Sequence, residues 1–154
     1  GGRILIPLTN LFLLFAVVAG AGVAFQAAIN SRLRFILGAP VWAASTQFVI
    51  GLVALAVVVL ASRQPMPSAD TLARTPWWMW TGGLFGAAFI FMTVVATPRL
   101  GAALMLGGVI VGHLAAALVI DHYGLFGAEV IPVSVMRLAG VALLVAGVVL
   151  IRGI

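Results

Sequence analysis

The stretch GAALMLGGVIVGHLAAALVI, residues 101–120, is a continuous apolar run that contains one histidine and no charged residue. A run of about 20 apolar residues is long enough for an α-helix to cross the hydrocarbon core of a bilayer. Because lipid offers no hydrogen-bond partners, a spanning segment must satisfy its backbone as a helix or within a closed barrel. The alternation of a barrel strand is absent, so the stretch predicts a transmembrane helix.

The rest of the chain has the same apolar character. Hydrophobic residues make up 64% of its 154 residues and charged residues only 7%, whereas a soluble domain carries about 25% charged residues. Such a chain has too few polar side chains to cover itself in water. We predict an all-α integral membrane protein whose single membrane domain covers residues 1–154 and lies in the lipid bilayer.

Apolar runs, and the polar segments between them, predict five transmembrane helices. Proline, glycine and arginine residues mark their ends. The segment INSRLRFILGAP, residues 29–40, is predicted to follow the first span as an amphipathic piece that Gly38 and Pro40 end, and Thr97-Pro98-Arg99 to form a tight turn. Two long connections begin at Ser62 and Asp121. The predicted spans cover residues 8–28, 41–61, 77–96, 101–120 and 135–151.

The charged residues exclude several classes of protein. Eight arginines and no lysine oppose three acidic residues, for a net charge of +5. The arginines are scattered between the apolar runs, which is typical of anchors facing lipid headgroups and not of a nucleic-acid-binding surface. The chain has no cysteine, its histidines and acids lack the spacing of a metal site, and no catalytic motif is present. We therefore expect no enzyme, no cofactor and no metal.

The arginines favour neither orientation in the membrane. Five spans would put four arginines on each side, so the positive-inside rule gives no preference. A chain without this bias can insert both ways, and two opposite copies can pair with the inverted-repeat symmetry of many secondary transporters. The alternative is that misplaced span boundaries or flanking tags spoil the count. The two sets are Arg3, Arg63, Arg74 and Arg137 against Arg32, Arg34, Arg99 and Arg152.

Four segments resemble a known family. FQAAINSRLRFILGAPVWAASTQFVIGLVAL, PWWMWTGGLFGAAF, TPRLGAALM and IDHYGLFG are similar in sequence, order and spacing to the YdcZ-like, short five-helix branch of the drug/metabolite transporter superfamily. The resemblance implies a multi-pass protein of the bacterial inner membrane, related to small multidrug exporters. It also implies members that insert in both orientations or occur as opposite pairs. The family's substrates are not established, so the resemblance carries over no site residues.

Polar residues inside the first two predicted spans are candidate substrate contacts. Gln26 and Asn30 are four residues apart and share one face of the first span, and Trp42 and Gln47 belong to the second. Uncharged amides suit a neutral or zwitterionic polar ligand. The alternative is that these side chains hydrogen-bond neighbouring helices and hold the bundle together.

His113 is a further candidate contact, since it is the only ionisable side chain expected near the middle of the membrane. It lies about twelve residues into its run, or roughly 18 Å along a helix. A neutral imidazole offers one donor and one acceptor, which could orient a polar substrate or bond a neighbouring helix. Gly108 and Gly112 lie beside it and leave room for either. In the family, glutamine is common at this position.

The acidic residues narrow the mechanism. Asp70, Asp121 and Glu129 all fall outside the predicted spans, so exchange of protons for cations on a membrane carboxylate lacks its central residue. We predict a transporter that exports a small polar or amphipathic molecule across the bacterial inner membrane. It would work by alternating access as an antiparallel homodimer. The alternative is a non-transporting membrane scaffold or regulatory subunit of a partner protein.

Dual insertion predicts two-sided labelling of the connection that begins at Ser62. A single cysteine introduced there, Gln64→Cys, would be the only thiol of the chain. It should react with a membrane-impermeant maleimide in both right-side-out and inverted membrane vesicles, because each orientation is populated. Reaction in one kind of vesicle only would contradict dual insertion.

Overall fold

The computed structural model describes residues 5–153, with side-chain surroundings from residue 10 onward. Every regular element in these residues is a helix. Five helical segments are long and apolar enough to cross a membrane, which confirms the expected all-helical architecture. The chain divides into two compact units, Gly1–Pro98 and Arg99–Ile154. They are called the first and the second unit below.

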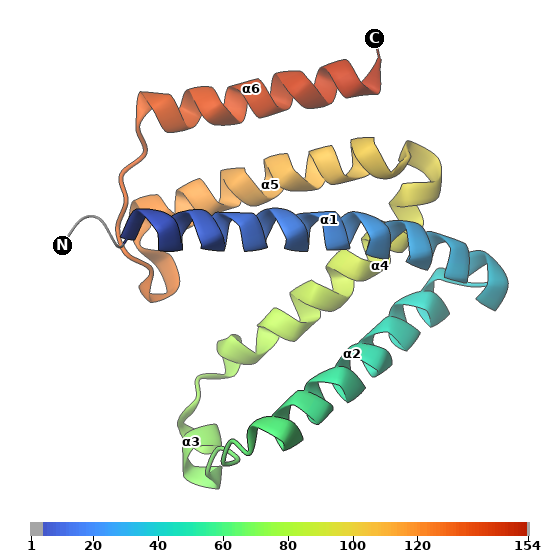
Figure 1. Ribbon diagram of the computed structural model, residues 1–154, viewed down its shortest axis with the longest axis vertical. Coiled ribbons are helices and arrows are strands. Elements are labelled where there is room, and N and C mark those ends of the chain that lie inside the picture. The colour runs from blue at the N-terminus through green and yellow to red at the C-terminus, as the bar shows by residue number, and fades with distance from the viewer. Residues whose placement is uncertain (1–4, 154) are drawn as a thin grey trace. The chain divides into compact units, whose positions relative to one another are not determined.

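The first unit begins with a helical hairpin. α1 runs over Leu5–Leu37 and α2 over Pro40–Ser62, and the two pack against each other (Figure 1). Pro40 lies in the first turn of α2, where its missing N–H leaves no helical hydrogen bond unmade. A short helix α3, a 3-10 helix η1 and α4 follow, over Ala69–Arg74, Trp77–Thr81 and Gly82–Leu100.

The predicted end of the first span at residue 28 was wrong, because α1 continues without a break to Leu37. The predicted end of the amphipathic piece at Gly38 is confirmed, since Gly38 directly follows α1. Polar side chains such as Asn30 and Arg34 do not end a helix, whereas glycine and proline do. The first Gly or Pro beyond the predicted span is Gly38, directly after the last residue of α1. The polar side chains of residues 29–37 therefore do not mark a break in the helix.

The predicted tight turn at Thr97-Pro98-Arg99 was also wrong, because all three residues lie inside α4. The turn comes at Gly101, whose φ of 78° is a conformation that glycine adopts without strain. A proline near the end of a helix removes only one hydrogen bond, so the helix can continue past it to Leu100. In this chain the freed carbonyl is bonded from another helix, as described below.

The core of the first unit consists of small and branched side chains. Ala43 and Ala44 of α2 are buried against Ile90 and Val94 of α4, and Leu33 of α1 packs on the same cluster. Small residues allow helix backbones to approach closely, as those of α1 and α2 do, whereas α4 joins this cluster through its side chains. This cluster holds α1, α2 and α4 together.

The second unit is also a hairpin. α5 covers Ala102–Tyr123 and α6 covers Val135–Arg152, with the short 3-10 helix η2 at Leu125–Gly127 between them (Figure 1). The two helices pack closely at Gly107, where an added Cβ would lie 2.9 Å from Cγ2 of Val148. At Gly108 and Gly112, which the sequence analysis singled out, an added Cβ would meet nothing within 4 Å.

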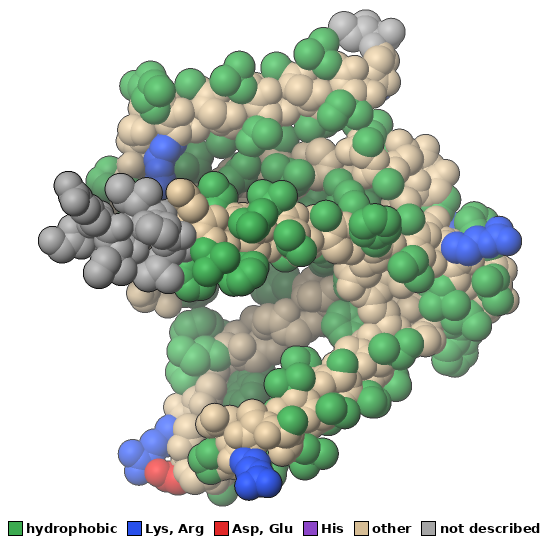
Figure 2. Space-filling model, viewed as in Figure 1, with side chains coloured by type: hydrophobic (Ala, Val, Ile, Leu, Met, Phe, Trp, Pro, Cys, Tyr) green, Lys and Arg blue, Asp and Glu red, His purple; other side chains and the backbone are tan. Residues whose placement is uncertain are grey.

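Large apolar side chains cover the outside of both units. Hydrophobic side chains extend along the helices on the face shown in Figure 2, while charged ones gather near helix ends and in connections. No residue of α6 is buried. This is the surface expected of a protein surrounded by lipid or by a second copy. Representative side chains with exposed fractions between 66% and 78% are Phe12, Leu60, Leu84 and Leu150.

The packing of α5 on α6 predicts different effects of alanine at two adjacent glycines. Gly108→Ala should hold or raise the apparent Tm, because alanine favours a helix over glycine by about 1 kcal/mol and its methyl group meets no atom. Gly107→Ala should lower the apparent Tm by a few degrees, because the methyl group must displace Val148. Thermal unfolding of the two purified variants checks this, and equal Tm values would contradict the packing.

Candidate functional site

Two of the predicted substrate contacts line one cavity of the first unit. Gln26 of α1 and Gln47 of α2 face a cavity of about 490 Å³ that is bounded by α1, α2 and α4. All of the lining residues are uncharged. Its apolar walls include Phe48, Leu52 and Leu55 of α2, with Phe89 and Ile90 of α4.

The side-chain amide of Gln47 is the polar group that most needs a partner in this cavity. Its Oε1 atom is buried and accepts no hydrogen bond from the residues that the structure describes. A buried acceptor left unsatisfied costs about 1–3 kcal/mol, so such an atom in a cavity calls for water or a ligand. The cavity therefore offers an acceptor, inside apolar walls, to a molecule that carries a hydrogen-bond donor.

The other three predicted contacts lie elsewhere. Asn30 is only 5% exposed, one helical turn along α1 from Gln26, and its Nδ2 donates no hydrogen bond to the described residues. Trp42 lies on α2 with 62% of its surface exposed and does not line the cavity. His113 is an exposed residue of α5, in the second unit.

A polar contact that the sequence analysis did not find joins α1 to α4. Arg34 Nη1 donates to the carbonyl oxygens of Val94 at 3.3 Å and Val95 at 3.4 Å. Nearby on α4, Thr93 and Thr97 are buried, and each hydroxyl donates to a carbonyl one turn earlier in its own helix. No local sequence pattern reveals a hydrogen-bond partner 60 residues away. Pro98, which has no N–H, does indicate that the carbonyl four residues before it lacks its helical donor.

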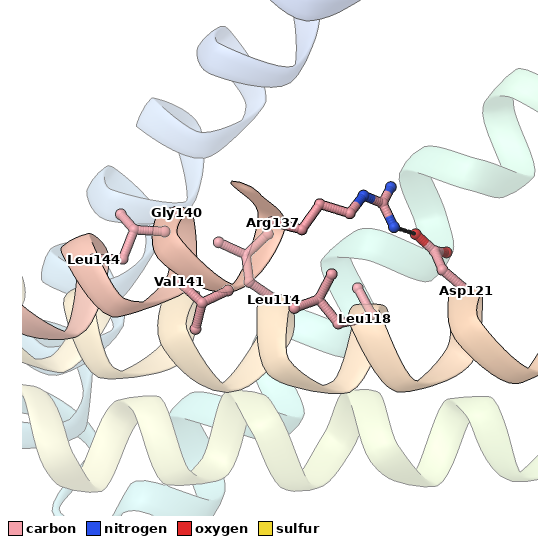
Figure 3. Close-up of a pocket in the computed structure, with 8 residues that line it drawn as sticks. Leu114, Leu118, Asp121, Arg137, Gly140, Val141 and Leu144 are labelled. Carbon is pink, nitrogen blue, oxygen red and sulfur yellow. Dashed lines mark hydrogen bonds and ion pairs between the residues drawn. The ribbon is translucent and has the colours of Figure 1, made fainter. Parts of the chain in front are cut away.

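The second unit contains an ion pair at a smaller cavity. Asp121 of α5 and Arg137 of α6 lie 3.2 Å apart, and each side chain is about one-third exposed. Figure 3 shows Arg137 extending toward Asp121 from the start of α6. Together with Leu114 and Leu118 they line a cavity of about 280 Å³. Asp121 was predicted to lie beyond the span, but it belongs to the last turn of α5.

The ion pair also fixes the connection between the two helices. Arg137 Nη1 reaches the carbonyl oxygen of Ile131, and the Ile131 N–H donates to the carbonyl oxygen of Asp121 at 2.8 Å. His122 takes part through Nδ1, which accepts from the N–H of Val133. Through these bonds Asp121 and His122 hold the connection between α5 and α6 in place. No group of three metal-ligating side chains occurs among the described residues.

Comparison with known proteins identifies one family. The family described as "Putative inner membrane exporter, YdcZ" matches residues 11–150, which confirms the resemblance seen in the sequence. No curated protein and no solved structure matches the chain. The matched family is one of exporters and not of enzymes, and its inner-membrane location agrees with the five apolar helices.

The ion pair predicts a coupling that a double-mutant cycle can measure. Asp121→Asn and Arg137→Gln should each lower the apparent Tm, and the double variant should lose less than the sum, with a coupling of about 1 kcal/mol. Asp70 and Arg74 provide the matched control, because this pair within α3 is more than two-thirds exposed. Asp70→Asn and Arg74→Gln should show almost no coupling. A cycle without coupling at Asp121 and Arg137 would contradict the pairing.

Proposed function

The chain belongs to the YdcZ exporter family, and from that membership we propose that it carries a small neutral or zwitterionic polar molecule out across the inner membrane. The substrate binds in the cavity of the first unit. The observation that carries this proposal is the buried, unpaired Oε1 of Gln47 inside a cavity whose lining residues are uncharged.

The chemistry of the cavity supports an uncharged or internally neutral substrate. Gln26 and Gln47 supply donors and acceptors without net charge, and no carboxylate lines the cavity to attract a lone cation. A volume of about 490 Å³ lies within the range of about 300–1,000 Å³ that small-molecule sites occupy. The phenyl and aliphatic walls favour a substrate with an apolar part.

Transport requires the cavity to open to each side of the membrane in turn. In many secondary transporters two oppositely oriented halves perform this exchange. We propose that two oppositely inserted copies of this chain provide the two halves. The equal division of the arginines supports dual insertion, and the exposed apolar helix faces leave ample surface for a second copy.

The alternative is a membrane scaffold whose amides bond a partner helix. A scaffold would keep the amide of Gln47 in a dry contact and would bind no small molecule in its place. A transporter must admit water and substrate to the same atom. Ligand binding at Gln47 therefore separates the two functions.

A thermal-shift screen of the purified protein tests substrate binding. Neutral and zwitterionic polar molecules with a hydrogen-bond donor are expected to include a binder that raises the apparent Tm. A ligand present at 100 times its Kd stabilises the native state by about 2.7 kcal/mol. Gln47→Leu should abolish the shift because it removes the acceptor of the cavity.

Gln64→Leu is the matched control, since Gln64 is an exposed residue of the connection after α2. It should leave the shift unchanged. A full shift in Gln47→Leu would move the binding site elsewhere. A binder restricted to lipophilic cations would contradict the proposed substrate class.

A further inference from the structure

Arg34 occupies a special position on α1. Pro98 of α4 has no N–H, so the carbonyl of Val94, four residues earlier, lacks its helical donor. Arg34 Nη1 donates to that carbonyl at 3.3 Å and to the next one, of Val95, at 3.4 Å. We propose that Arg34 is a latch that holds α1 against α4 at the proline and closes the cavity on that side.

The latch lies at the end of a polar face that starts in the cavity. Gln26, Asn30 and Arg34 follow each other at intervals of four residues, so they share one face of α1. Arg34 therefore lies roughly 12 Å along the helix from the cavity residue Gln26. Asn30 lies between them and is only 5% exposed, and its Nδ2 has no acceptor among the described residues.

The part of α4 that Arg34 contacts has several features that favour bending of the helix. The hydroxyl of Thr93 donates to the carbonyl of Phe89 at 2.8 Å, and that of Thr97 to the carbonyl of Thr93 at 2.7 Å. Bonds of this kind to the preceding turn bend helices, and Pro98 removes one backbone bond in the same stretch. α4 can thus change its curvature here without breaking further helical hydrogen bonds.

The bonds of the latch are suited to opening and closing. Distances of 3.3 and 3.4 Å lie beyond the usual 2.7–3.2 Å of an N–H···O bond, and one nitrogen serves both carbonyls. Arg34 is half-buried in the last turn of α1, from where a long side chain can reach the headgroup region when released. Release frees the carbonyl of Val94 for water or for a donor group of the substrate.

The latch would act as the gate of the proposed transporter, so its role rests on the proposed function. Its opening can nevertheless be tested without a substrate. The chain has no cysteine, so Gly86→Cys introduces a single thiol at the cavity wall. An added Cβ at Gly86 meets nothing within 4 Å. The rate of reaction with a membrane-impermeant maleimide, in lipid nanodiscs that expose both faces, reports how often the cavity opens.

Arg34→Leu should raise the labelling rate of this thiol about tenfold, the factor that loss of one hydrogen bond from a charged donor produces. Adding Pro98→Ala should leave the rate raised, because alanine restores an N–H to the carbonyl of Val94 but does not restore the link between α1 and α4. Arg32→Leu, at an exposed arginine two residues away, should leave the rate unchanged. An unchanged rate in Arg34→Leu, or a return to the rate of the Gly86→Cys protein when Pro98→Ala is added, would overturn the latch.

Two milder variants keep the test decisive should Arg34→Leu fail to fold. Arg34→Lys keeps a charged donor and should label at a rate between those of the parent and the leucine variant. Pro98→Ala alone should label faster than the parent, because the alanine N–H then occupies the carbonyl of Val94 and takes from Arg34 one of its two acceptors. Labelling of Pro98→Ala no faster than the parent would contradict the latch. Failure of the ligand screen would instead count against the exporter, so the two failures are distinguishable.

Discussion

A polar group without a partner in lipid costs several kcal/mol, and this constraint governs both units of the chain. In the first unit, Pro98 leaves the carbonyl of Val94 without its helical donor, and a guanidinium from α1 supplies one. In the second unit, Arg137 satisfies the carboxylate of Asp121 and a carbonyl of the connection together. The amides of Asn30 and Gln47 are the exceptions among the described residues. Unpaired buried groups of this kind are where a ligand or a moving helix is expected.

Much of the fold follows from the sequence, because apolar runs near 20 residues leave a chain in lipid few alternatives to helices. The helix ends were predicted less well. Asn30 and Arg34 look like the start of a connection, but they are polar residues inside a continuous helix. Pro98 looks like a turn, but a partner 64 residues earlier in the chain, Arg34, allows the helix to pass it. Gln26 and Gln47 were identified as candidates from their polarity alone. Their common cavity and the contact of Arg34 depend on tertiary packing, which no local pattern records.

The two units divide the polar residues by chemistry. The cavity of the first unit is lined by uncharged residues, whereas the ion pair of the second unit ties α5, α6 and their connection. This division supports a substrate held by hydrogen bonds and shape, with the charges reserved for structure. The cavity beside Gln47 contains no carboxylate on which protons could be exchanged for cations. In the proposed exporter, substrate specificity depends on Oε1 of Gln47, because only a molecule with a hydrogen-bond donor satisfies this buried acceptor.

A transporter needs a cavity beside Gln47 that admits water, whereas a scaffold does not. Gly51 lines this cavity, and an added Cβ there meets nothing within 4 Å. The test is the maleimide reactivity of Gly51→Cys in native membranes, compared with Val53→Cys, an exposed position two residues along the same helix that does not line the cavity. We expect that Gly51→Cys reacts and that a bound polar ligand protects it. A thiol at position 51 that reacts no faster than one at position 53 would show that the cavity excludes water and would contradict transport through it.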